Sequence, residues 1–215
     1  FDRIGLSLMG KQVELLKTLY ATGKPVVLVM IQGRPLELNW AAEHIPAILT
    51  AWYQGGEGGR AIADVLFGDY NPAGRLPLSY PRHVGQLPVY YNHKSAGRQD
   101  YVEGTAAPLY PFGYGLSYTT FAYDGVKMRV EGDSVRVSVD VRNSGDRVGD
   151  EVVQLYLRDE QASVVTPFMQ LKAFQRVHFT SGKSRNVEFV LTVEHLRLLD
   201  ASLNWRVEPG WFTVM

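Results

Sequence analysis

The pattern of hydrophobic positions changes its period along this chain near residue 119. Residues 10–22 carry apolar side chains at the three- and four-residue spacing of a helix, and Gly23 then provides a stop signal. Residues 25–31 form a continuous, mostly apolar run, which is typical of a strand covered on both faces in a parallel sheet. The pattern therefore predicts an α/β arrangement for the first part of the chain.

The same part of the chain predicts a second helix, a second strand and a third helix. Asn39 is a candidate N-cap for a short helix that runs to His44, and residues 47–52 predict a strand. The third helix is expected over residues 59–67. Its apolar side chains expected to face the sheet are Ile62, Val65 and Leu66. This alternation of helices and strands fits βαβ units.

A glycine-rich turn, residues 55–59, leads into the third helix. The run lacks the Lys-Ser/Thr pair of a P-loop, so we interpret it as a tight strand-to-helix turn rather than a phosphate cradle. Glu57 in this turn is well placed against the positive end of the helix dipole. Asp64 follows Arg60 by one helical turn, and this spacing predicts an ion pair rather than a catalytic group.

Residues 71–111 are rich in proline, glycine and tyrosine and predict an extended strap. Two roles are open for its tyrosines: they stack on sugar rings together with Trp40 and Trp52, or they pin the strap to its neighbours.

Beyond Tyr118 the apolar positions alternate with polar ones, as in half-buried antiparallel strands. The alternation is clearest over residues 135–141 and returns at 153–157 and 187–191. Polar and glycine clusters at 143–146 and 180–183 predict turns between these runs. Several short strands at this spacing predict a small β-sandwich.

The composition argues against several classes of binding partner. Lys and Arg number 22 and so do Asp and Glu, so there is no basic excess for nucleic acid. The longest apolar runs are shorter than the roughly 20 residues of a membrane-spanning helix, so no membrane partner is expected. The chain has no cysteine, and its 5 histidines show no metal-binding spacing, so neither a disulfide nor a metal is assigned.

Several runs, taken in order, resemble the C-terminal part of bacterial family 3 glycoside hydrolases of the β-glucosidase type. The matching runs are residues 1–8, 23–35, 57–81, 111–121 and 141–156. The resemblance implies the latter half of an α/β sandwich with a largely parallel sheet, followed by a fibronectin type III-like β-sandwich. The expected division is 1–91 for the α/β part, 92–118 for the strap and 119–215 for the β-sandwich, which would lack its last strand.

The resemblance also implies an activity. Such an enzyme is an exo-acting, retaining β-glucosidase that removes terminal non-reducing β-D-glucosyl residues and needs no cofactor or metal. Its nucleophilic Asp lies on an N-terminal barrel, and its acid/base Glu lies just before the motif that Asp2-Arg3 resembles. This chain is thus expected to begin after both catalytic carboxylates, and to be inactive alone. Two alternatives are a structural or carbohydrate-contacting module, and a β-xylosidase or arabinosidase of the same family.

The strap supplies the candidate substrate-side contacts, Asp100 and Tyr101. The carboxylates available in loops are Asp2, Glu57, Asp69, Asp100 and Glu103, and no pair among them is identifiable as a catalytic dyad. The expected partners are an oligosaccharide or aryl β-glucoside substrate, the N-terminal barrel of the same protein and, as a possibility raised by the family, a second copy in a homodimer. The resemblance implies a periplasmic or secreted enzyme.

Overall fold

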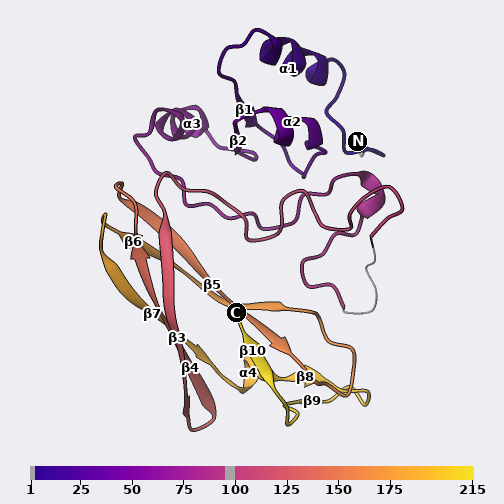
Figure 1. Cartoon of the computed structure of the whole chain (residues 1–215). Coiled ribbons are helices and arrows are strands. Elements are labelled where there is room, and N and C mark those ends of the chain that lie inside the picture. The colour runs from indigo at the N-terminus through magenta and orange to yellow at the C-terminus, as the bar shows by residue number, and fades with distance from the viewer. Residues whose placement is uncertain (1–2, 95–99) are drawn as a thin grey trace. The chain divides into compact units, whose positions relative to one another are not determined.

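The computed structural model describes residues 3–94 and 100–215, which form two compact units (Figure 1). Within the described residues, unit 1 comprises 3–70, 76–90 and 100–114, and unit 2 comprises 71–75, 91–94 and 115–215. The chain therefore passes from one unit to the other several times. The boundaries expected from the sequence, at residues 92 and 119, stay predictions.

Unit 1 is an α/β unit around a parallel pair of strands. Its elements are α1 (Gln12–Ala21), β1 (Val27–Met30), α2 (Asn39–His44), β2 (Ala47–Thr50), α3 (Gly58–Phe67) and the short 3-10 helix η1 (Val84–Gln86). β1 and β2 pair in parallel from Val27 opposite Ala47 to Met30 opposite Thr50. The buried core residues are Leu16, Met30, Leu38, Ala41, Ile45 and Tyr80.

These elements confirm the predicted α/β class, and three local expectations prove wrong. The strand predicted to be covered on both faces leaves Val27 and Ile31 exposed, because no element of the described residues packs over these two side chains. Asn39 lies inside α2, whose N-cap is Leu38, and the Asn39 side-chain amide donates to a backbone carbonyl 2.6 Å away, at Arg82. Finally, α3 buries none of its residues, and Leu66 is exposed.

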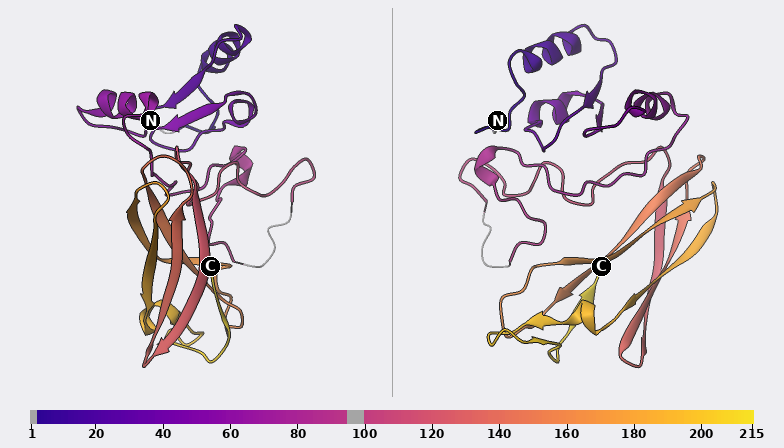
Figure 2. Two further views of the ribbon diagram at one scale, coloured as in Figure 1. Left: turned by 60° about the vertical axis from the view of Figure 1, so that its left-hand side comes forward. Right: turned by 180° about the vertical axis from the view of Figure 1, so that it is seen from behind.

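Unit 2 is a β-sandwich of two three-stranded antiparallel sheets (Figures 1 and 2). Its main strands are β3 (Phe121–Glu131), β4 (Ser134–Asn143), β5 (Gly149–Asp159), β6 (Gln170–Phe179), β7 (Ser184–Leu191) and β10 (Phe212–Val214). One sheet has the order β3-β4-β7 and the other β10-β5-β6. A small helix α4 (Val193–Leu196) and the pair β8 (Leu198–Leu199) and β9 (Trp205–Arg206) follow β7.

The alternating sequence pattern explains the core of unit 2. Apolar side chains at every second position point to one face of a strand, so two such sheets bury them against each other. The buried residues are Val137, Val139, Val141, Val153, Leu155, Leu157, Val177, Phe179, Val187, Phe189 and Leu191. This confirms the predicted strands and the predicted sandwich.

Residues 71–75 are built into unit 2, far in sequence from the strands they contact. The Asn71 side chain accepts from the Ser117 hydroxyl at 2.9 Å and from the Tyr118 amide at 2.8 Å, and it donates to the Val148 carbonyl at 2.9 Å. The backbone passes so close to Gly115 that a Cβ there would collide with the carbonyl oxygen of Gly74. These contacts explain why Asn71 and Gly115 occupy positions with little room for other side chains.

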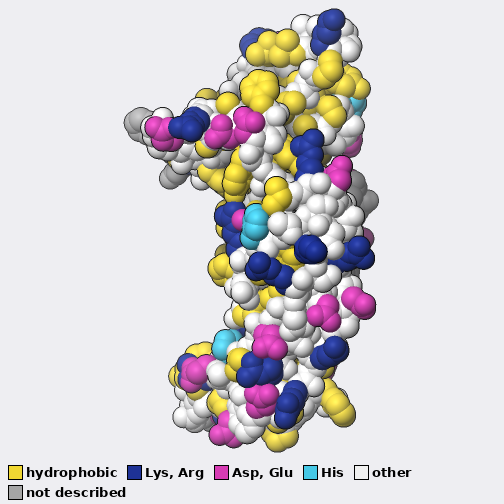
Figure 3. Space-filling model, turned by 90° about the vertical axis from the view of Figure 1, so that its left-hand side faces the viewer, with side chains coloured by type: hydrophobic (Ala, Val, Ile, Leu, Met, Phe, Trp, Pro, Cys, Tyr) yellow, Lys and Arg dark blue, Asp and Glu magenta, His cyan; other side chains and the backbone are white. Residues whose placement is uncertain are grey.

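The surface carries both signs of charge. On the face shown in Figure 3, basic and acidic side chains are intermingled with apolar ones, as the equal numbers of acidic and basic residues lead one to expect. None of the helices in residues 3–94 and 100–215 has the length and apolar character needed to cross a bilayer.

Candidate functional site

The loops that follow β1 and β2 form the first candidate site. In α/β sheets, ligands bind outside the carboxyl ends of parallel strands, where loops rather than the sheet itself present their side chains. β1 ends at Met30 and leads to Gln32 and Gly33, while β2 ends at Thr50 and leads to Trp52 and Tyr53. We therefore describe these two loops, and the Tyr80 segment beneath them, as the carboxyl-edge site.

A buried polar cluster holds the two loops together. Tyr80 is almost fully buried, and its phenol oxygen accepts a hydrogen bond from the Gln32 side-chain amide and lies 3.2 Å from the Thr50 hydroxyl. Burial raises the pKa of Tyr80, and the hydrogen bonds to Thr50 and Gln32 only partly oppose this, so the phenol stays neutral. The cluster thus joins both strand ends to the Tyr80 segment through uncharged groups.

Two aromatic residues follow β2, and the backbone around them is constrained. Trp52 has a φ of 56°, a left-handed conformation that non-glycine residues rarely adopt. Such a conformation persists only where the surrounding residues hold the backbone in place. The Tyr53 ring lies against Gly33, where an added Cβ would be 2.5 Å from the ring carbon Cε2. Gly33 therefore leaves space for Tyr53, whose side chain is largely exposed at this edge.

Sequence reasoning identified Trp52 as a possible sugar-stacking residue but missed Tyr53 and Gly33. The signal that was available is the glycine directly after Gln32, because a glycine at the end of a parallel strand often marks a close approach of another group. Which group approaches is decided by the fold.

The glycine turn before α3 has the predicted structure. The Gly58 amide donates to the Gly55 carbonyl at 3.0 Å, and Glu57 takes the N-cap position without a side-chain hydrogen bond to the helix. Arg60 and Asp64 form the expected ion pair at 4.0 Å, with both side chains exposed. Glu57 is therefore part of a turn, as the sequence analysis interpreted it.

The remaining candidate carboxylates lie in separate places. Asp69 lies two residues after the end of α3, and Asp100 and Glu103 lie in the loop 100–106. Asp2 lies outside the described residues. In residues 3–94 and 100–215 there is no group of three or more His, Cys, Asp or Glu side chains that could hold a metal ion.

The substrate-side candidates, Asp100 and Tyr101, form contacts within unit 1. Asp100 Oδ1 accepts from the Ala106 amide at 2.8 Å, and this bond, together with one from Thr105, lowers the pKa of the Asp100 carboxyl. The Tyr101 hydroxyl donates to the Gly85 carbonyl at 3.2 Å. Both side chains thus shape their loop.

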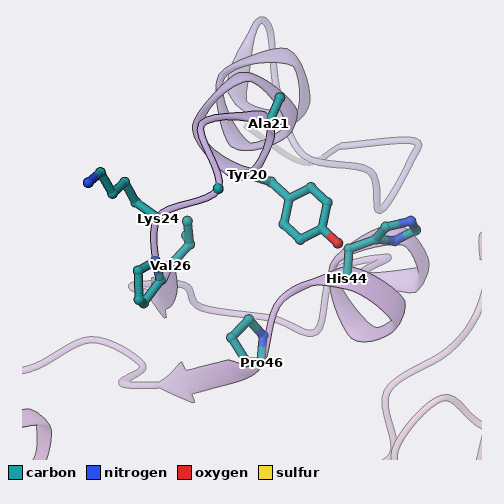
Figure 4. Close-up of a pocket in the computed structure, with 8 residues that line it drawn as sticks. Tyr20, Ala21, Lys24, Val26, His44 and Pro46 are labelled. Atoms are coloured by element: carbon teal, nitrogen blue, oxygen red, sulfur yellow. The ribbon is translucent and has the colours of Figure 1, made fainter.

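A shallow pocket lies at the opposite edge of the parallel strands (Figure 4). Its lining comes from the end of α1, the segment before β1, the last residue of α2 and the turn before β2. The residues are Tyr20, Lys24, Val26, His44 and Pro46. The Tyr20 ring meets the His44 ring edge-on, with centroids 5.5 Å apart. Because this is the amino edge of the strands, we do not assign it to the carboxyl-edge site.

The order of the two units defines the class: an α/β unit with a parallel strand pair, followed by a fibronectin type III-like sandwich. Comparison with known proteins gives the family. Residues 1–118 match the C-terminal domain of glycosyl hydrolase family 3, and residues 151–215 match a fibronectin type III-like domain. The chain belongs to glycoside hydrolase family 3, as its motifs predicted.

Relatives of known name are similar to this chain over nearly its whole length. It is 46% identical to a β-xylosidase of Formosa agariphila and 44% identical to the periplasmic β-glucosidase of Salmonella typhimurium, over 99% of its length in each case. It superimposes on a β-glucosidase from Erythrobacter marinus with a TM-score of 0.96 at 48% identity, covering 100% of this chain and 29% of that one. The chain spans only 31% and 30% of the two curated relatives, so it corresponds to a C-terminal portion of them.

Proposed function

We propose that residues 1–215 form the C-terminal part of an exo-acting, retaining β-glucosidase that removes terminal non-reducing β-D-glucosyl residues. The observation that carries the proposal is the similarity to β-glucosidases over the full length of the chain, through both units in the same order. The carboxyl-edge site supports it, because Trp52 and Tyr53 offer aromatic surfaces at the edge where α/β sheets meet their ligands.

The chemistry of the complete enzyme would be double displacement. Retention needs two carboxyl groups about 5 Å apart, one acting as nucleophile and the other as acid and then base. Of the candidate loop carboxylates, Glu57 lies in the turn before α3 and Asp100 accepts a hydrogen bond within its own loop. We propose that both catalytic groups lie outside residues 1–215. The role of this chain would then be to support the catalytic loops and to border the substrate.

A β-xylosidase of the same family is the second candidate. The 46% identity to the Formosa agariphila β-xylosidase favours it about as much as the 44% identity to the Salmonella typhimurium β-glucosidase favours glucose. One hydroxymethyl group separates the two sugars, so the choice rests on the residues that surround that group.

The test compares two chromogenic substrates and two polypeptides. The full-length protein is expected to hydrolyse 4-nitrophenyl β-D-glucoside with a higher kcat/KM than 4-nitrophenyl β-D-xyloside, whereas the polypeptide 1–215 is expected to release no nitrophenol from either. A reversed preference would favour the β-xylosidase. Turnover by residues 1–215 alone would refute the placement of the catalytic groups, and inactivity of the full-length protein on both substrates would favour a non-catalytic module.

Asp100 and Tyr101 stay proposed substrate-side contacts. In the full-length enzyme, Asp100→Asn and Tyr101→Phe are expected to raise KM by about 3- to 10-fold with little change in kcat, because uniform binding would be lost. Glu103→Gln, in the same loop, is the matched control. Unchanged KM values would leave the two residues with their loop-shaping contacts alone.

Two further properties come from relatives rather than from this chain. The Salmonella typhimurium relative is named as periplasmic, and this supports a periplasmic or secreted location for the whole protein. A homodimer stays a proposal, for which sedimentation of the full-length protein is the direct measurement.

A further inference from the structure

The dipeptide Asp124-Gly125 lies at a break in the ladder between β3 and β4. Asp124 lies opposite Asp140, and the next regular pair joins Lys127 to Ser138. Between these pairs, two residues of β3 oppose one residue of β4, which is the arrangement of a β-bulge. A bulge interrupts the regular hydrogen bonds of a ladder, so the backbone at Gly125 is less constrained than the regular part of β3.

Gly125 suits this bulge because it has no Cβ. Its φ is 62°, in the left-handed region that glycine adopts at no steric cost. An added Cβ would come no closer than 3.9 Å to a neighbouring group, and the nearest atom is Oδ2 of Asp140. The space beside this peptide unit is therefore open.

The Asp124 carboxyl is not held by other groups. It is exposed, and within the described part of the chain it has neither a hydrogen bond nor an ion pair. Asp140 on the opposite strand, in contrast, accepts from the Asn186 side-chain amide at 2.7 Å and lies 4.0 Å from the Lys127 ammonium. Like charges directly opposite each other on neighbouring strands repel. The Asp124 side chain is thus free to turn away from Asp140 and toward its own backbone.

The position of β3 in its sheet also favours local movement. In the order β3-β4-β7, β3 is an edge strand, labelled in Figure 1. Opening of an edge strand breaks one ladder rather than two, so it needs less free energy than opening of a central strand. The peptide unit between Asp124 and Gly125 can therefore leave its place without global unfolding of unit 2.

We propose that Asp124 is a site of spontaneous isomerisation to isoaspartate. The peptide nitrogen of Gly125 attacks Cγ of the protonated Asp124 side chain, so that an N–Cγ bond forms and a Cγ–O bond breaks. One water molecule leaves, made of the carboxyl hydroxyl and the amide proton, and a cyclic succinimide remains. Water then adds to either carbonyl carbon: addition at Cγ restores aspartate, and addition at the main-chain carbon gives isoaspartate. Both steps are redox-neutral and need no reactant besides water.

Isomerisation changes the strand beside a buried contact of unit 2. Isoaspartate carries one additional methylene in the backbone, directly after Tyr123. The Tyr123 hydroxyl donates to Glu151 at 2.7 Å, and Glu151 in turn pairs with Arg75. The inserted carbon shifts β3 relative to β4 and so weakens the Tyr123 contact in isomerised molecules. This inference does not depend on the proposed sugar specificity.

Ageing of the full-length protein in buffer tests the proposal, with isoaspartate detected in tryptic peptides by isoaspartyl methyltransferase. Asp133 is the matched internal control: it is exposed in the turn of the same hairpin, but Ser134 follows it and carries a Cβ that hinders the attack. The two aspartates fall in different peptides because trypsin cleaves after Lys127. The Asp124 peptide is expected to gain isoaspartate several-fold faster than the Asp133 peptide. In heavy-oxygen water it is also expected to take up one heavy oxygen, because hydrolysis of the succinimide adds an oxygen from the solvent.

Asp124→Glu is the control variant. The longer side chain would have to close a larger ring, and the residue is exposed, so this variant is expected to fold and to lose the signal from this peptide. Equal rates in the Asp124 and Asp133 peptides would overturn the proposal. So would isoaspartate without uptake of heavy oxygen, because the product would not have passed through the succinimide. A signal that persists in Asp124→Glu would also overturn it, since the isoaspartate would then come from another residue.

Discussion

The ion pair between Arg75 and Glu151 offers the sharpest test of how unit 2 is held together. The two groups lie 2.5 Å apart, and their side chains are only 13% and 10% exposed. The Tyr123 hydroxyl donates to the other oxygen of Glu151 at 2.7 Å. Arg75→Met keeps the unbranched stem of the side chain but removes the guanidinium, and so leaves the Glu151 carboxylate buried without its cation.

The expected loss in the free energy of unfolding is large for a single ion pair. Removing one partner of a buried ion pair costs about 3–5 kcal/mol, because the remaining charge loses its compensation without regaining water. Tyr123 continues to stabilise the carboxylate, so we expect a value near the lower end, about 3 kcal/mol. Burial and the nearby Glu151 both raise the pKa of Tyr123, so its hydroxyl keeps the proton it donates.

Hydrogen exchange of the β5 amides measures this loss for unit 2 alone. A loss of about 3 kcal/mol accelerates exchange through global opening by about 100-fold, since 1.4 kcal/mol corresponds to a factor of ten. Lys127→Met is the matched control in the same unit: its partner Asp140 is 4.0 Å away and both side chains are exposed, so its effect is expected to stay below about 1 kcal/mol. The double variant Arg75→Met with Glu151→Met is expected to recover part of the loss, because no charge is left buried.

Equal effects of Arg75→Met and Lys127→Met would refute the reasoning. So would a double variant whose loss equals the sum of the two single ones, because additivity would mean that the two groups do not interact.

Three further predictions address the same unit. Asn71→Ala removes three hydrogen bonds and is expected to lower the free energy of unfolding by about 2–3 kcal/mol, as measured by calorimetry. A loss below about 0.5 kcal/mol would contradict this expectation. Gly115→Ala is expected to destabilise the protein because its Cβ meets a carbonyl oxygen, whereas Gly74→Ala, which meets nothing within 4 Å, is the control in thermal unfolding. Burial acts to raise the pKa of Asp150, but hydrogen bonds from a histidine and an arginine outweigh it and the pKa is lowered. The folded state therefore binds fewer protons than the unfolded state. The contribution of Asp150 to the free energy of unfolding is complete above about pH 4 and is lost as the pH falls further. Asp150→Asn should remove that part of the acid-induced fall in Tm, and an unchanged fall would contradict it.

The sequence predicted elements best where one physical period dominates. In unit 2, Val137, Val139 and Val141 are buried and the polar residues between them are not, as the alternation predicted. A strand that packs on one face separates apolar from polar side chains in this way. In unit 1 the helices and strands also lie where the pattern placed them. Predictions about faces failed there, at Val27, Ile31 and Leu66, because the burial of a side chain depends on neighbouring elements that the local pattern does not contain.

The candidate site was harder to predict from the sequence. Asn39 was expected to cap its helix, yet its amide reaches a carbonyl 43 residues away. Tyr53 was not predicted as a site residue, although Gly33, which leaves space for its ring, can be read from the sequence. In both cases the partner is distant in sequence, so spacing rules that apply within one helix or strand carry no information about it.

The sequence by itself determined the family, the order of an α/β part and a β-sandwich, and the nature of the glycine turn, because each depends on local patterns and motifs. Only the tertiary structure placed Asn71 and Arg75 within unit 2 and gathered Gln32, Thr50 and Tyr80 into one buried cluster. The physical reason is that burial and hydrogen bonding belong to pairs of groups, and the chain brings those pairs together only when it folds.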